Sequence, residues 1–73
     1  MQRNRIQINS DEDIVKLHQI ANTFKGNIYV EDLNNCRINA KSLLGLFATK
    51  DFNSLYLVSE EEVPYNIIKD FLI

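Results

Sequence analysis

The chain has 73 residues, of which 45% are hydrophobic and 25% charged, and its formal net charge at pH 7 is -2. This composition excludes a disordered or fibrous chain and indicates one compact domain over residues 1–73. The slight negative charge disfavours nucleic acid and anionic membranes as partners, because binding to either would gain little free energy from the release of counterions. The apolar runs are far shorter than the roughly 18 residues that cross a bilayer, and the start of the chain lacks a signal-peptide pattern. We therefore expect a cytoplasmic protein.

A strand and then an amphipathic helix are predicted at the start of the chain. Ile6 and Ile8 alternate with polar residues, which indicates a half-buried strand that stops at Ser10. The Ser10 hydroxyl can accept a hydrogen bond from a free backbone N–H, and the three acids after it suit the positive end of a helix dipole. Apolar residues then recur on one side of a helix that we expect over about 11 to 24. They are Ile14, Leu17, Ile20, Ala21 and Phe24.

Three more strands and two more helices are predicted in the rest of the chain. The turn-forming pair Asn34–Asn35 separates two short strand patterns and indicates a hairpin. Ser42 precedes a short apolar helix, and another strand follows that helix. Glu60–Glu62 place acids at the start of the last helix, and Pro64 suits its first turn. The strands are expected at Ile28–Val30, Arg37–Asn39 and Leu55–Val58, and the helices at Leu43–Phe47 and between Glu60 and Leu72.

The predicted element order is β-α-β-β-α-β-α. Short hairpin connections favour a mainly antiparallel four-stranded sheet. Amphipathic helices must bury their apolar faces, so we expect them all on one face of that sheet. The predicted fold class is therefore α+β, in the form of an open-faced sandwich.

Few residues suggest catalysis. His18 is the only histidine, and it borders the apolar side of its helix, where a boundary role is more common than acid–base chemistry. The acids Asp11, Glu12 and Asp13 are typical of a solvated helix start rather than a cation site. Cys36 is the only cysteine, which excludes an internal disulfide or a cysteine-based zinc cluster. We expect no enzyme activity, no metal and no cofactor.

A family resemblance is strongest over the segment Ile38–Leu46, which reads INAKSLLGL. This segment closely resembles the motif around the regulatory serine of HPr, the small phosphocarrier protein of the bacterial sugar phosphotransferase system, and of its catabolite-repression paralogue. Two further stretches, Ala21–Phe24 and Ile28–Glu31, resemble the end of that family's first helix and its second strand. The element order is similar as well, so the resemblance covers nearly all of residues 5 to 72 and implies an HPr-like open-faced sandwich.

The phosphorelay site that the resemblance implies is incomplete. In the family, a histidine in a His-Ala-Arg-Pro stretch begins the first helix, and the matching stretch here is Ser10-Asp11-Glu12-Asp13. Backbone N–H groups and a guanidinium stabilise a phosphohistidine at such a helix end. Glu12 at the arginine position would instead repel a phosphoryl group. We therefore expect a degenerate member that has lost histidine phosphocarrier activity.

Contacts with other proteins are also implied by the resemblance. The family's serine at the position of Ser42 is phosphorylated by a dedicated kinase and then helps to bind a transcription regulator. A phosphate there would lie at a helix start beside Lys41, although a plain N-cap role explains Ser42 equally well. Leu43, Leu44 and Phe47 form one helical stripe, part of which docks on partner enzymes in the family. The implied partner is a phosphotransferase-system enzyme, a serine kinase or a transcription regulator.

The sequence therefore predicts a non-catalytic HPr-like domain that acts through protein contacts and is controlled at Ser42. Two alternatives stay open. One is an active phosphocarrier that uses another acceptor, for which His18 is the candidate. The other is a small α+β ligand-binding module in which the likeness around the serine is a coincidence.

Overall fold

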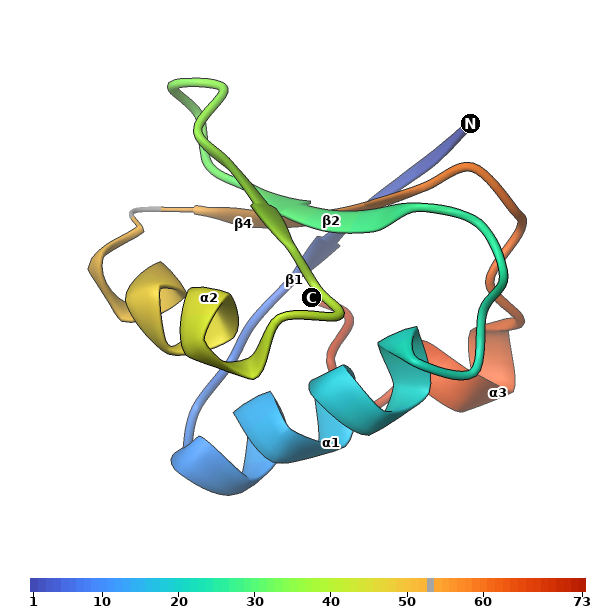
Figure 1. The fold of residues 1–73 in the computed structure, drawn as a ribbon, viewed down its shortest axis with the longest axis horizontal. Helices are drawn as coiled ribbons and strands as arrows, with labels where there is room; N and C mark the ends of the chain where they lie inside the picture. The colour runs from blue at the N-terminus through green and yellow to red at the C-terminus, as the bar shows by residue number, and fades with distance from the viewer. Residues whose placement is uncertain (53) are drawn as a thin grey trace.

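The computed structural model describes residues 1–52 and 54–73, which form four strands and three α-helices. The strands make one sheet, and the helices lie together on one face of it (Figure 1). This arrangement confirms the predicted α+β open-faced sandwich. The elements are β1 (Gln2–Ile6), α1 (Asp11–Ala21), β2 (Ile28–Glu31), β3 (Arg37–Asn39), α2 (Leu43–Ala48), the 3-10 helix η1 (Thr49–Asp51), β4 (Leu55–Ser59) and α3 (Tyr65–Ile68). Within the described part of the chain, no helix is long and apolar enough to cross a membrane.

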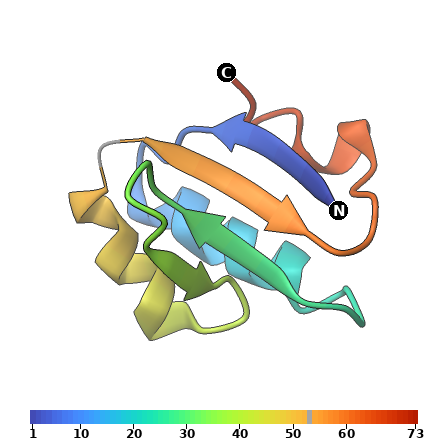
Figure 2. The same ribbon diagram turned by 90° about the horizontal axis from the view of Figure 1, so that it is seen from above.

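The sheet has the strand order β1-β4-β2-β3, and each neighbouring pair is antiparallel. The two central strands, β4 and β2, therefore come from opposite halves of the chain (Figure 2). The outer edge of β1 is covered by the C-terminal segment, because Leu72 forms an isolated bridge with Ile6 and the Gln7 N–H donates to the Phe71 carbonyl at 2.8 Å. These pairings hold both ends of the chain on the same sheet.

One hydrophobic core fills the space between the sheet and the helices. Alternate strand residues point into it, as the period-two pattern requires, and one face of α1 covers them. Each of its members is at most 4% exposed. They are Ile6, Ile14, Leu17, Ala21, Ile28, Val30, Ala40, Leu46, Leu57, Val63, Ile68 and Phe71.

The first strand and the first helix differ from prediction at their ends. β1 begins at Gln2 and ends at Ile6, so the expected continuation through Ile8 is wrong. Ile8 is half-buried against the core outside the sheet, and this contact explains its apolar character. α1 begins at Asp11 as predicted but ends at Ala21, because the Phe24 N–H donates to the Ala21 carbonyl in a tighter, three-residue turn.

The last helix is much shorter than predicted. α3 begins after Pro64 and has only four residues, so the acids before it are not in its first turn. Two of these acids instead accept hydrogen bonds from a distant loop: Glu60 Oε1 from the Asn27 N–H at 2.8 Å, and Glu61 Oε1 from the Gly26 N–H at 2.9 Å. The acidic run therefore joins the segment after β4 to the segment before β2, because backbone N–H groups that leave a helix or strand need partners.

The predicted hairpin between β2 and β3 is confirmed. Asn35 adopts the left-handed backbone conformation with φ 62°, as asparagine tolerates. The Asp32 carboxylate closes the turn by accepting from the N–H groups of Asn34 at 2.8 Å and Cys36 at 3.0 Å. Cys36 is exposed at this turn.

Candidate functional site

The N-terminal end of α1 is capped by a side chain of the chain itself. Ser10 is the N-cap, with extended backbone angles, and its hydroxyl accepts from the Asp13 N–H at 3.2 Å. The Asp13 carboxylate reaches back and accepts from the Asn9 N–H at 3.0 Å. This reciprocal pattern is a variant of the capping box: the cap hydroxyl accepts from an N–H of the first turn, and an acid of the first turn accepts from an N–H just before the helix.

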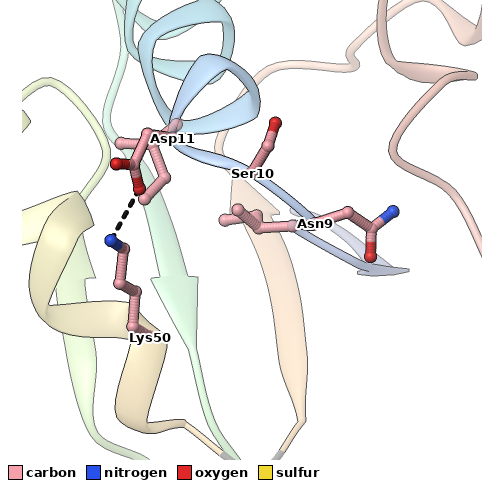
Figure 3. Close-up of a pocket in the computed structure, with 6 residues that line it drawn as sticks. Asn9, Ser10, Asp11 and Lys50 are labelled. Carbon is pink, nitrogen blue, oxygen red and sulfur yellow. Dashed lines mark ion pairs between the residues drawn. The ribbon is translucent and has the colours of Figure 1, made fainter.

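Lys50 of η1, the short helix that follows α2, contacts the same end of α1. Its Nζ lies 2.6 Å from Asp11 Oδ1 (Figure 3) and 5.3 Å from the centroid of the Phe47 ring. Both partners of the ion pair are exposed, so it contributes little to stability. A shallow pocket of about 250 Å³ lies here, lined by Ile8, Asn9, Ser10, Asp11, Ile14 and Lys50.

The charge at this end of α1 is negative. Asp11, Glu12 and Asp13 all belong to the first turn, and Glu12 is exposed. Of the three carboxylates at the positive end of the helix dipole, that of Asp11 forms the ion pair with Lys50. Over residues 1–52 and 54–73, no group of three or more histidine, cysteine or acidic side chains is placed to hold a metal ion. The geometry is that of an acid-matched helix start.

His18 lies about 10 Å along the axis of α1 from its first residue, since the rise is about 1.5 Å per residue. Its ring is half-buried, and both ring nitrogens lie 3.3 Å from Nδ2 of Asn22. The same amide donates to the His18 carbonyl at 2.9 Å. The histidine therefore packs within the helix, away from the N–H groups of the first turn.

Ser42 is the N-cap of α2. Its hydroxyl accepts from the Gly45 N–H at 3.1 Å, and its own N–H donates to the Asn39 carbonyl at 3.0 Å. The side chain is exposed. The expected positive charge beside it is engaged elsewhere, because Lys41 Nζ donates to the Phe24 carbonyl at 2.6 Å. Lys41 therefore joins the loop before α2 to the segment that follows α1.

The apolar stripe of α2 divides between surface and core. Leu44 is 86% exposed and Leu43 is 37% exposed. Phe47 is half-buried and packs against the core, and Leu46 is completely buried. Of the three predicted contact residues, the leucines form the surface part, and Phe47 joins them to the core.

Comparison with known proteins was made by sequence and by structure. No protein-family model matches the sequence, and no curated protein matches it. Among solved structures, the chain is similar to the crystal structure of HPr-C-His from Thermoanaerobacter tengcongensis, with 25% sequence identity and a TM-score of 0.66. The match covers 94% of this chain and 84% of the other. The chain has an HPr-like fold.

This HPr-like fold brings together two of the regions that the sequence singled out. The start of α1 and the end of α2 meet at Lys50, which contacts both Asp11 and Phe47. Ser42 lies at the opposite end of α2 from this contact. The sequence analysis missed Lys50, because a single lysine in a short polar stretch carries no periodic or motif signal. Only the packing of α2 against α1 reveals its position.

Proposed function

We propose that this HPr-like chain is a protein-interaction or regulatory domain that does not carry phosphate at the start of α1. The observation that most supports this is the acidic first turn of that helix, which Ser10 caps. A phosphoryl group at Ser10 would compete with the Asp13 N–H bond and would lie beside exposed Glu12. One such carboxylate within a few ångströms raises the free energy of the phosphorylated state by about 2 to 4 kcal/mol.

The chemistry of the side chain supports the same proposal. A phosphohistidine is a phosphoramidate, which transfers its phosphoryl group readily, whereas a serine phosphate is an ester and a poor donor. His18 is the chain's only histidine, and it lies too far along α1 to use the N–H groups of the first turn. We therefore propose that the chain keeps the fold of a phosphocarrier but does not transfer phosphate.

The test is incubation with phosphoenolpyruvate and the first enzyme of a bacterial phosphotransferase system. We expect no acid-labile phosphate on this chain, while an authentic HPr in the same reaction is labelled. The matched variant Ser10→His/Glu12→Arg restores the two missing groups and is expected to accept measurable phosphate. Stoichiometric acid-labile phosphate on the unmodified chain would contradict the proposal, and its loss in His18→Ala would identify the alternative acceptor.

The proposed contact surface is the exposed part of the α2 stripe, Leu43 and Leu44. The Leu44 side chain is 86% exposed and so contributes little to the stability of the fold. Its apolar surface is available to a partner. We expect Leu44→Asn to weaken binding to the phosphotransferase-system enzyme about tenfold or more in a titration. Ile67→Asn is the control, because Ile67 is also partly exposed but lies on α3. Equal effects of both variants would count against the stripe.

Ser42 is proposed as the site at which this contact is controlled. Its hydroxyl is exposed and adjoins Leu43 in sequence, so a phosphate on it would change the charge next to the stripe. Treatment with the family's serine kinase and ATP, followed by mass spectrometry, is expected to add one phosphate to the chain and none to Ser42→Ala. An unmodified chain would leave Ser42 with its capping role alone.

A further inference from the structure

The side of the sheet opposite the helices forms a second surface, which we call the open face (Figure 2). The register places one residue from each strand in a row across it, since Arg5 is opposite Tyr56, Tyr56 is opposite Glu31, and Glu31 is opposite Arg37. Sequence neighbours of three of them belong to the core, namely Ile6, Leu57 and Val30. The strand residues of the open face are Arg3, Arg5, Tyr29, Glu31, Arg37, Asn39, Tyr56 and Val58.

The charge of the open face is opposite to that of the whole chain. All three arginines of the sequence lie on it, whereas the five lysines lie outside the strands. Three arginines against the single acid Glu31 give the face a charge of +2, while the chain as a whole has -2. The open face therefore has a net positive charge although the chain as a whole is negative.

Two of the guanidinium groups are held in fixed positions. Arg3 lies 4.1 Å over the Tyr56 ring, and Arg37 lies 4.6 Å over the Tyr29 ring. Both converge on the Glu31 carboxylate, since Arg37 Nε donates to Oε2 at 2.7 Å and Arg3 Nη2 lies 3.8 Å from Oε1. The Glu31 side chain is only 10% exposed, whereas the arginine side chains remain about half exposed, at 51% and 45%.

This composition is typical of the energetically important part of a protein–protein interface. Tyrosine and arginine are enriched in such surfaces and lysine is depleted. Side chains that are already fixed lose little entropy when a partner binds, which strengthens each contact. A guanidinium that is stacked on a ring still presents N–H groups at its edge, and these suit the two oxygens of a carboxylate.

We propose that the open face binds an acidic segment of another protein. The excess of positive charge supplies the complementarity. The guanidiniums of Arg3 and Arg37 supply fixed donors, and exposed Arg5, opposite Tyr56 in the same row, supplies a third. Single-stranded nucleic acid fits less well, because its bases stack on exposed aromatic rings and the guanidiniums cover the rings of Tyr29 and Tyr56. The surface lies on the other side of the sheet from α2, so this inference does not depend on the proposed function of the Leu43–Leu44 stripe.

The experiment is a titration with a fluorescein-labelled decaglutamate peptide, followed by anisotropy and by the amide chemical shifts of the isotope-labelled chain. We expect the shifts to concentrate on β1, β2 and β3 and to leave α2 unchanged.

Arg5→Gln is the test variant, since removing Arg37 would leave buried Glu31 without its closest partner. Its affinity is expected to fall about five- to tenfold, with the unfolding midpoint unchanged. Lys16→Gln, on the exposed side of α1, removes the same charge and is expected to change the affinity less than about twofold.

Other outcomes would overturn the proposal. Equal weakening by Arg5→Gln and Lys16→Gln would show attraction to the overall charge of the chain and no defined surface. Tighter binding of a labelled deoxythymidine decamer than of the peptide would assign the face to nucleic acid. A concentration-dependent dimer whose shifts map to the open face would assign it to a second copy of the chain, and no measurable binding of the peptide would also contradict the inference.

Discussion

Gly45 illustrates how a single residue positions an element of this HPr-like fold. A Cβ atom added to it would lie 2.7 Å from Cγ2 of Ile38, closer than carbon atoms normally approach, and 3.2 Å from the Ser42 hydroxyl oxygen. The glycine therefore allows α2 to approach β3 while its N–H donates to the capping hydroxyl of Ser42. The same small residue serves both the packing and the candidate regulatory site.

We expect Gly45→Ala to lower the free energy of unfolding by about 1 to 3 kcal/mol, because the extra methyl overpacks the contact with Ile38. This net loss would occur although alanine favours a helix by about 1 kcal/mol over glycine. Urea unfolding followed by circular dichroism measures the difference. Gly26→Ala is the control, since its nearest neighbour is the end of the flexible Glu61 side chain at 3.1 Å, and a larger loss there would contradict the argument.

At the scale of an element, α2 combines a structural side with an exposed side within six residues. Leu46 is completely buried in the core, and Leu44, two residues earlier, is 86% exposed. The helix begins at a side-chain cap and is followed directly by η1, so it is too short to place the two roles on separate segments of its length. The structural and the proposed contact roles are divided by helix face.

We expect Leu46→Ala to lower the free energy of unfolding by about 2 to 4 kcal/mol, because it removes buried methyl groups and leaves a cavity. Leu44→Ala makes the same chemical change on the same helix and is expected to stay within about 0.5 kcal/mol of the unmodified chain. Equilibrium unfolding of the two variants compares them directly. Similar losses would mean that Leu44 is part of the core and not available to a partner.

The described residues of the whole molecule share one sheet and one core. β4 joins β1 to β2, and the C-terminal segment pairs with β1, so neither end of the chain can leave without opening the sheet. The helices and the sheet share one core. A domain of this size has a stability of about 4 to 11 kcal/mol, which local losses readily affect.

We expect thermal unfolding of Tyr65→Phe to give the same midpoint by far-ultraviolet circular dichroism and by tyrosine fluorescence. The substitution removes the tyrosine of α3, so the fluorescence reports Tyr29 and Tyr56 on the open face, whereas circular dichroism is dominated by the helices. Coincident transitions are the sign of two-state behaviour. Separate midpoints would show that the sheet face and the helices unfold independently.

Much of the fold could be predicted because its signals are local. The Ser10 and Ser42 caps bond to N–H groups three residues away, and the turn at Asn35 depends on the backbone preference of one residue. The predicted element order and the antiparallel sheet follow from such signals. The predicted site residues were placed on the correct elements for the same reason, although the exposure of Leu43, Leu44 and Phe47 could not be assigned.

Local sequence therefore determined which elements form, where most of them begin, and that no histidine stands at the start of α1. The tertiary structure alone decided which groups meet across long separations: Glu61 with Gly26, 35 residues apart, Lys50 with Asp11, and Arg3 with Arg37 around Glu31. The physical reason is that hydrogen bonds within a turn are specified by neighbouring residues, whereas charged side chains on exposed loops and strands pair with whatever the packed core brings within reach.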